Sequence, residues 1–232
     1  PGRRTLVADA ATMTRLVAAR HPGAKLFLMG ESMGAAVLMC LAAEDPPPDV
    51  AGWVLIAPAV WGRSEMSWAE RAGLWVMVHA VPGLTVGGGG LHIRASDNRA
   101  ALIALGRDPL TLLRTRWDAV GGLVRLMGAA ARAAPDLPAD TLMLYGGKDE
   151  LIPRRAMRAV WRHLPDPGPR MAYYPGGYHL LLRDLGRARP IGDILAWMRE
   201  PEAALPSGAG REARLWLGRA RRGTAVAARA LH

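Results

Sequence analysis

The strongest constraint on this chain is a five-residue turn, Gly30-Glu31-Ser32-Met33-Gly34, which follows an apolar run at 26–29 and precedes a helical pattern at 35–43. A serine with a glycine two positions away on each side, leaving a strand and entering a helix, is the pattern of a nucleophile elbow. We expect the turn to strain the serine backbone and to leave room only for hydrogen at both glycines. The same geometry directs the Met33 N–H, at the start of the helix, toward the atom that Ser32 attacks, where an oxyanion needs a donor.

Length and composition favour a soluble globular protein of the cytoplasm. The 232 residues are enough for one domain with a large buried core. No apolar run reaches the ~18 residues of a membrane span, and no secretion signal is recognisable at the N-terminus. Cys40 is the only cysteine of the sequence, so we expect it to be a small buried apolar residue and not half of a disulfide.

The net charge of +10 comes almost entirely from arginine, since Lys25 and Lys148 are the only lysines. The arginines are scattered except near the C-terminus, which argues against a nucleic-acid partner and favours an anionic lipid surface. A linker at 206–210 leads into a basic tail that mixes arginines with apolar residues, Trp216 and Val226 among them. This composition fits an interfacial basic helix or, equally, a mobile solvated tail.

Strand and helix patterns alternate in the way that builds a parallel sheet. Apolar spacing predicts helices at 5–20, 33–43, 154–164 and 191–198, and strands at 25–29, 50–57, 141–145 and 171–174. The alternation breaks between 62 and 138, where helical patterns appear at 67–81, 96–105 and 110–134. We predict a helical cap there, inserted into a core of residues 1–61 and 139–200 and followed by the tail at 201–232.

Two features of the predicted cap bear on its flexibility and on its possible contact with a membrane or an acyl chain. Four glycines at 87–90 indicate a flexible joint, because no Gly-Lys-Ser/Thr helix start follows them as in a phosphate-binding loop. An apolar stretch at 74–81 is too short to span a bilayer but is suited to a membrane surface or an acyl tunnel. Ordinary packing of a cap helix on the core is the alternative.

An acid and a base follow two later strands of the predicted sheet. Asp149 comes just past the strand at 141–145, and His179 just past the strand at 171–174. Because parallel strands end along one edge of a sheet, both side chains can converge on Ser32. The order Ser, Asp, His then assigns the roles: His179 takes the proton of Ser32, and Asp149 fixes the imidazole tautomer.

Each of these assignments has rivals in the sequence. Asp149 could instead cap the helix that follows it, and Glu150 beside it could be the acid. Only His179 follows a core strand, whereas the rival histidines lie on helices, in a turn or in the cap: His21, His79, His92 and His163. Asp184, close behind His179, is interpreted as an ion pair with Arg183.

Together the turn at 30–34, the segment Gly146–Pro153 and Gly177-Tyr178-His179 resemble the monoacylglycerol lipase and lysophospholipase group of α/β-hydrolases, which includes serine aminopeptidase-type members. The resemblance covers most of residues 5–200 and implies a mostly parallel α/β-hydrolase sheet. It also implies hydrolysis of a lipid-like carboxylic ester, a monoacylglycerol or lysophospholipid, through an acyl-Ser32 intermediate without metal or cofactor. Ile152 and Leu180 would line the acyl pocket by the same resemblance, unless they are ordinary core residues.

The sequence departs from that group in two respects. The group's His-Gly dipeptide, which supplies a second oxyanion-hole amide, does not occur here, and the four predicted core strands all belong to the second half of such a sheet. We therefore expect the N-terminal strands to be missing and this segment by itself to be inactive. A non-catalytic binding protein of the same fold, or a hydrolase of peptides or amides, are the alternative functions.

Overall fold

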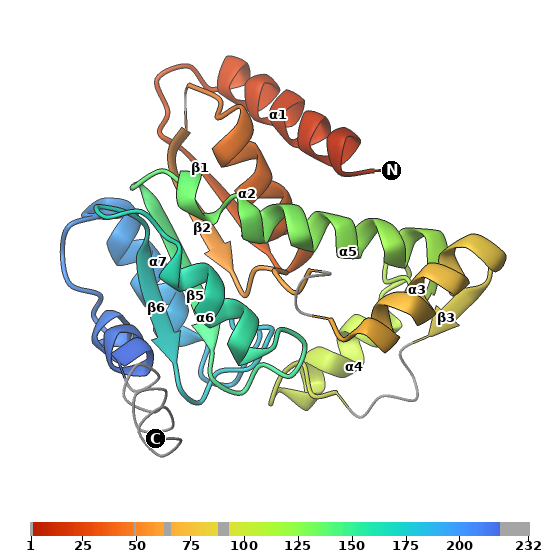
Figure 1. The fold of residues 1–232 in the computed structure, drawn as a ribbon. Coiled ribbons are helices and arrows are strands. Elements are labelled where there is room, and N and C mark those ends of the chain that lie inside the picture. Colours follow the sequence, from red (N-terminus) through yellow and green to blue (C-terminus); the bar gives the residue numbers. More distant parts are fainter. Residues whose placement is uncertain (1, 49, 63–65, 88–92, 219–232) are drawn as a thin grey trace, which may run out of the picture.

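A four-stranded sheet forms the centre of the molecule (Figure 1). The computed structural model describes residues 2–48, 50–62, 66–87 and 93–218. The strands run in the order β1-β2-β5-β6, and every neighbouring pair is parallel. Their bounds are β1 (Leu26–Glu31), β2 (Val50–Ile56), β5 (Thr141–Gly146) and β6 (Arg170–Tyr174). The predicted α/β fold with a mostly parallel sheet is confirmed.

Helices cover both faces of this sheet (Figure 1). They are α1 (Arg3–Arg20), α2 (Met33–Glu44), α5 (Trp117–Arg132), α6 (Arg154–Arg162) and α7 (Ala188–Arg199). Side chains alternate across the sheet, so Trp53 and Leu55 of β2 join a core cluster with α1, α2, α5 and α6. Val54 and Ile56 join a second cluster with α7 on the other face. The strands are therefore buried on both sides, which explains their continuous apolar sequences.

The helix that follows Ser32 is the most deeply placed of the set. Every residue of α2 from Ala35 to Ala42 is buried, since the helix lies between β1, α1 and α5. A helix that is apolar all round belongs in such a position. Cys40 is unpaired and fully buried there, as expected.

Within the predicted cap, the described elements are α3 (Trp68–Ala80), β3 (Thr85–Gly87), α4 (Arg99–Arg107) and β4 (Arg114–Arg116). The prediction of one helix over 110–134 is wrong in its first part, because β4 pairs antiparallel with β3 and α5 begins only at Trp117. Arg114 fixes this pairing by donating hydrogen bonds to the hydroxyl and carbonyl of Thr85. The glycines at 88–90 and His92 lie outside the described residues.

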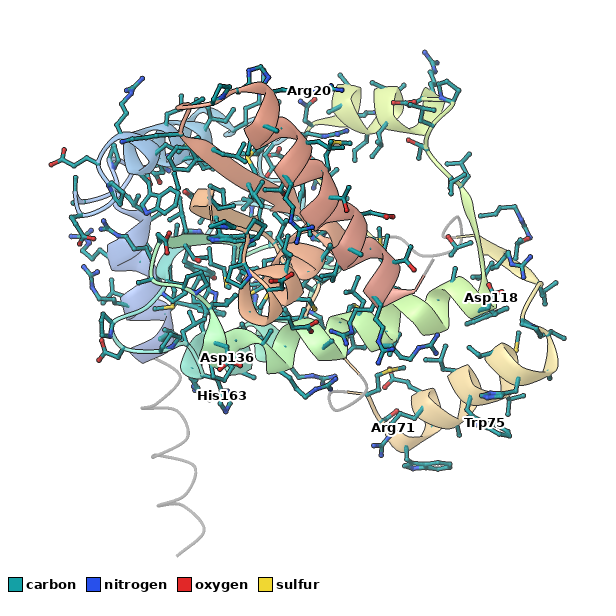
Figure 2. The ribbon with its side chains drawn as sticks, turned by 90° about the horizontal axis from the view of Figure 1, so that it is seen from above. Arg20, Arg71, Trp75, Asp118, Asp136 and His163 are labelled. Carbon is teal, nitrogen blue, oxygen red and sulfur yellow. The ribbon has the colours of Figure 1, made fainter. Side chains whose placement is uncertain are left out.

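The helices of this region differ in burial. None of the residues of α3 or α4 is buried, and Figure 2 shows Trp75 on the outer side of α3, where its ring stacks on His79. In α5, by contrast, Val124, Leu126 and Met127 belong to the main core cluster. The boundary of the cap at residue 138 stays a prediction, and the packing of α5 against α2 favours a boundary nearer the start of α5.

The C-terminal segment packs on the core as far as it is described. Residues 209–218 are helical, and Trp216 is only 7% exposed. Its ring stacks on Tyr173 of β6 at a centroid distance of 4.8 Å and meets Trp161 edge-on at 5.3 Å. The expectation that Trp216 serves an interfacial or solvated tail is therefore wrong, because the side chain fills the aromatic part of the core. Val226 lies outside the described residues.

The two edges of the sheet differ in whether another segment of the chain covers them. Along β6 the segment 201–212 runs beside the strand, and Arg170 donates a hydrogen bond of 2.7 Å to the carbonyl of Ala203. Among the described strands β1 pairs only with β2, and Met29 in β1 is 58% exposed. One edge is thus covered by the chain itself and the other is open.

Candidate active site

Ser32 occupies a strained turn between β1 and α2. Its backbone has φ 54° and ψ −115°, a conformation that costs a non-glycine residue about 1–3 kcal/mol. The turn is held from β2, since the Ser32 N–H donates to the Ile56 carbonyl at 2.9 Å and its carbonyl accepts from the Ala59 N–H at 3.0 Å. The neighbouring Met33 opens α2, so no carbonyl of a preceding helical turn occupies its N–H. Ser32 and this donor therefore lie together at the carboxyl edge of the sheet.

The two glycines of the turn are not equivalent. A Cβ at Gly30 would lie 2.6 Å from the carbonyl carbon of Gly34, so hydrogen is required there as predicted. At Gly34 the same prediction is wrong, because no described atom other than those of its chain neighbours and of its own helix backbone lies within 4 Å of the corresponding position. The first turn of α2 stands beside the open edge of the sheet, where no further described strand packs against it.

Asp149 and His179 form a buried hydrogen-bonded pair. The distance between His179 Nδ1 and Asp149 Oδ2 is 2.8 Å, and both side chains are almost completely inaccessible. The other oxygen, Asp149 Oδ1, accepts from the N–H groups of Leu151 and Ile152 at 2.8 and 2.9 Å. The carboxylate is thus fixed by its own loop and directed at Nδ1, which leaves Nε2 of the imidazole for another partner.

Close packing between the ends of β5 and β6 explains why this pair meets. The Gly147 N–H donates to the Tyr174 carbonyl at 2.7 Å, and the Lys148 N–H to the Gly177 carbonyl at 2.8 Å. A Cβ at Gly146 would collide with the backbone of Gly177 and Tyr178. The two loops therefore lie directly against each other, and the glycines that precede Asp149 permit that approach.

A second clamp holds the histidine loop from the side of the predicted cap. The buried carboxylate of Asp184 accepts from Ser96 Oγ at 2.6 Å and from the Tyr178 N–H at 2.8 Å. The predicted ion pair of Asp184 with Arg183 is therefore wrong, because both carboxylate oxygens serve hydrogen bonds inside the fold. Sequence reasoning missed Ser96, since it lies 88 residues before Asp184 and no local pattern marks it.

The rival residues take other positions. Glu150 accepts a hydrogen bond of 2.7 Å from the Arg94 N–H and is exposed, so it faces away from the paired imidazole. The exposed histidines His79 and His163 each bond a carbonyl of their own helix, and His21 ends α1 in solvent. Of the histidines that the structure describes, His179 is the one joined to a carboxylate.

Ser32 follows β1, whereas Asp149 follows β5 and His179 follows β6, and β2 lies between β1 and β5 in the sheet. Among the described residues no hydrogen bond joins the Ser32 hydroxyl to His179. Glu31, the residue before Ser32, lies near enough to His179 and Arg183 for electrostatic interactions with them to lower its pKa. Burial raises the pKa of Glu31 above its ordinary value of 4.5, and the electrostatic interactions with His179 and Arg183 only partly offset this. One oxygen of Glu31 is buried without a hydrogen-bond partner among the described residues.

The residues predicted for the acyl pocket lie next to the pair. Ile152 is buried in the main core cluster, where its carbonyl accepts from the Tyr145 hydroxyl at 2.7 Å, whereas Leu180 is partly exposed. Their part in binding an acyl chain stays a prediction. No cluster of three His, Cys, Asp or Glu side chains suited to a metal ion occurs among the described residues.

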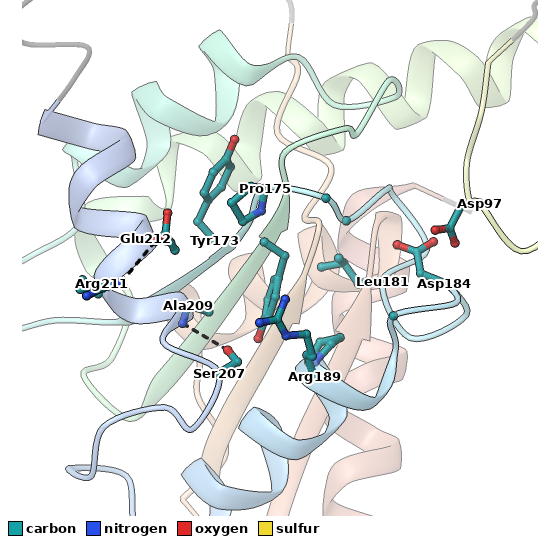
Figure 3. Close-up of a pocket in the computed structure, with 15 residues that line it drawn as sticks. Asp97, Tyr173, Pro175, Leu181, Asp184, Arg189, Ser207, Ala209, Arg211 and Glu212 are labelled. Carbon is teal, nitrogen blue, oxygen red and sulfur yellow. Dashed lines mark hydrogen bonds and ion pairs between the residues drawn. The ribbon is translucent and has the colours of Figure 1, made fainter.

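A hollow of about 530 Å³ lies behind the histidine loop, between β6, the start of α7 and the segment 207–212 (Figure 3). Figure 3 shows Asp184 at one side of it, Arg211 and Glu212 at the other, and Arg189 between them. Ser32, Asp149 and His179 do not line this hollow. It borders the clamp of the histidine loop and is separate from the candidate active site.

The parallel sheet, the strained serine at a strand-to-helix turn and the later acid and histidine loops define a protein of the α/β-hydrolase fold. Residues 1–186 match the family described as serine aminopeptidase, S33, and the chain belongs to that family. The resemblance identified from the three sequence motifs is thereby confirmed.

Solved structures show the same fold. The monoacylglycerol lipase of Paleococcus ferrophilus superimposes with a TM-score of 0.67 at 23% identity, over 83% of this chain and 74% of that chain. A soluble variant of the monoglyceride lipase of Saccharomyces cerevisiae gives a TM-score of 0.67 at 17% identity, over 84% and 68% of the two chains.

Among curated relatives, the monoglyceride lipase of Mus musculus is 28% identical over 194 residues, which are 81% of this chain and 63% of the relative. The human monoglyceride lipase is 29% identical over 168 residues, 71% of this chain and 54% of the relative. The monoacylglycerol lipase of Mycolicibacterium smegmatis is 25% identical over 203 residues, 83% and 68% of the two chains. The chain therefore spans about half to two thirds of the length of these relatives.

Proposed function

We propose that this protein is a serine hydrolase that cleaves a carboxylic ester of a lipid-like substrate, a monoacylglycerol or a lysophospholipid. The observation that carries the proposal is the 2.8 Å hydrogen bond between the buried side chains of His179 and Asp149. It lies at the same edge of the sheet as Ser32, whose strained turn is the place where a nucleophile is presented. An acid, a base and a nucleophile are thus available without a cofactor.

The proposed reaction proceeds in two halves. His179 Nε2 takes the Ser32 hydroxyl proton as Oγ attacks the ester carbonyl. Asp149 accepts a hydrogen bond from the Nδ1–H and stabilises the imidazolium. The Met33 N–H donates to the oxyanion. The C–O bond to the alcohol then breaks, and His179 returns the proton to the leaving alkoxide, which leaves an acyl-Ser32 ester. A water molecule, deprotonated by His179, attacks this ester. The bond to Ser32 Oγ then breaks, Oγ takes the proton back from His179, and the fatty acid is released.

The substrate class rests on the relatives, which are named monoglyceride and monoacylglycerol lipases. Such substrates reside in membranes, so we include contact with a membrane surface from the cytoplasmic side in the proposal. Among the described residues no helix is long and apolar enough to cross a bilayer. The family description, serine aminopeptidase, supports peptide or amide hydrolysis as the second candidate activity.

The test is the loss of serine chemistry in the complete protein. Ser32→Ala should abolish labelling by a fluorophosphonate and lower kcat for a monoacylglycerol by roughly 10⁶, because the three residues act as a unit. Ser67→Ala, at the exposed start of α3, serves as the matched control and should keep both properties. Turnover near that of the unmodified protein in Ser32→Ala would refute the assignment. Labelling with hydrolysis of an amide but not of an ester would favour the second activity.

A further inference from the structure

Three leucines stand out from the rest of the apolar surface. Leu110, Leu112 and Leu113 are 88, 85 and 66% exposed, and they share one short turn between α4 and β4. We call residues 108–113 the leucine tip. Scattered single apolar residues on a surface need no explanation, but three leucines within four positions form a patch that water solvates poorly.

The leucine tip is an ordered turn. Asp108 organises it, since its carboxylate accepts from the Leu110 N–H at 2.8 Å and its carbonyl from the Thr111 N–H at 3.0 Å. On the far side Arg114 ties the chain to Thr85 of β3. Hydrogen bonds therefore fix both ends of the turn. The three leucine side chains project into solvent and are not packed against the rest of the protein.

The leucine tip is connected to the candidate active site through α4. Just before α4, the Ala95 carbonyl accepts from the Leu180 N–H at 2.9 Å, and the Asn98 side chain donates to the Arg183 carbonyl at 2.9 Å. The nine residues of α4 then rise about 14 Å along the helix axis. Since none of them is buried, α4 extends from the histidine loop as a short arm that ends in the tip.

The charges around the tip favour an anionic surface. Arg99 and Arg107 lie on α4, and Arg114 and Arg116 on β4, against Asp108 within the turn. The Arg116 guanidinium is paired with Asp118. That of Arg114 bonds the neutral Thr85 and, among the described residues, no carboxylate, so the region keeps a positive excess. Arginines beside exposed leucines match the two parts of a lipid interface, phosphate headgroups and acyl chains.

A second copy of the chain fits this surface less well. A stable protein interface needs about 800 Å² from each partner, far more than three leucines on one turn can offer. We propose that the leucine tip inserts into the surface of a membrane that contains anionic lipid and holds the candidate active site beside it. This inference extends the proposed function, but binding to lipid requires no turnover. Of the segments that the sequence offered for a lipid surface, the basic tail loses Trp216 to the core.

Sedimentation with vesicles tests the inference on the complete protein. We expect binding to phosphatidylcholine vesicles that contain phosphatidylglycerol, and an affinity at least about tenfold lower for the double variant Leu110→Glu, Leu112→Glu. The matched control is Met13→Glu with Leu16→Glu, which are 61 and 49% exposed and belong to α1. Figure 1 shows α1 at the top of the molecule and α4 at the bottom. This control should bind as the unmodified protein does, and thermal unfolding should show both variants folded.

Three results would overturn the inference: no binding by the unmodified protein, equal loss in the tip and control variants, or unchanged binding after the tip is altered. If sedimentation equilibrium instead shows a dimer that only the tip variant dissociates, the surface joins two copies and the membrane assignment is wrong. Ser32→Ala separates the two proposals. It should bind vesicles normally, so a failure of vesicle binding leaves the hydrolase proposal standing, and a failure of hydrolysis leaves the membrane contact standing.

Discussion

At the scale of single residues, Glu31 is the most unusual side chain of the candidate site. It directly precedes Ser32, and one of its carboxyl oxygens is buried without a partner among the described residues. Burial is the main cause of its raised pKa, while the charges of His179 and Arg183 act in the opposite direction. Burial of this carboxyl group is unfavourable for its charged form, and the group forms part of the electrostatic surroundings of the imidazole.

The raised pKa gives a prediction for stability. Between pH 4.5 and the higher pKa in the folded protein, the folded state binds more protons than the unfolded state, so stability falls as the pH rises through that window. Glu31→Gln cannot ionise and should therefore be more stable than the unmodified protein at neutral pH, with the difference vanishing below pH 4.5. Urea unfolding at both pH values measures this. The exposed control Glu150→Gln should show no such pH-dependent gain, and an equal gain there would contradict the explanation.

The choice between two adjacent acids gives a second prediction at this scale. Asp149→Asn should lower kcat by roughly 10⁴, because an amide holds the wrong imidazole tautomer. Glu150→Gln should change kcat little, since that side chain bonds the Arg94 N–H on the outer side of the loop. Steady-state kinetics on one ester, with labelling by a fluorophosphonate as a check, distinguishes them. A larger loss in Glu150→Gln would mean that the acid is misassigned.

At the scale of elements, the sequence predicts correctly those strands whose apolar character follows from burial on both faces of the sheet. The strands β1, β2, β5 and β6 agree with their predicted ranges to within two residues, because strands covered on both faces are continuously apolar. The positions of Asp149 and His179 at one edge of the sheet can likewise be predicted from the sequence, since each follows a strand. The clamp between Ser96 and Asp184 was not, because it joins segments with no common local pattern.

The errors at 110–116 and at Trp216 have one physical cause. Residues 110–113 are compatible with a helix, and only the Asp108 turn and pairing with β3 make them a turn and a strand. Trp216 follows a Gly-rich linker in a basic segment, and only the aromatic faces of Tyr173 and Trp161 decide that it is buried. Tertiary contacts determine the structure in both places, and a single sequence does not display them.

The buried position of Trp216 leads to a prediction for the element that carries it. Trp216→Ala should reduce the free energy of unfolding by about 3–5 kcal/mol, the cost of removing a large aromatic side chain from a core. Leu215→Ala, one position earlier and 44% exposed, is the matched control and should change stability little. Chemical denaturation compares the two variants. Equal midpoints for Trp216→Ala and the unmodified chain would show that the helix at 209–218 does not pack on β6 in solution.

At the scale of the whole molecule, the edge of β1 that no other described strand covers is the surface most prone to association. Unpaired backbone groups along an edge strand promote association with other chains, and natural proteins often place a lysine there to prevent it. We expect the mean mass of the 232-residue chain to rise with concentration, and Met29→Lys in β1 to reduce that rise. Met13→Lys on α1, with a similar exposure of 61% against 58%, is the control. Light scattering that shows no difference between the two variants would contradict a role of this edge.

The placement of the three candidate residues on the sheet has a mechanical consequence. Asp149 and His179 belong to the pair β5 and β6, whose ends are locked by backbone hydrogen bonds, whereas Ser32 belongs to β1 and β2. The two halves join through β2 and β5, which share four paired positions against six and five in the other pairs. We expect heat or pressure that weakens the β2–β5 pairing to separate Ser32 from His179 before it separates His179 from Asp149. A protein altered in this way would keep the hydrogen bond between His179 and Asp149, while Ser32 would lie too far from the imidazole to react with it.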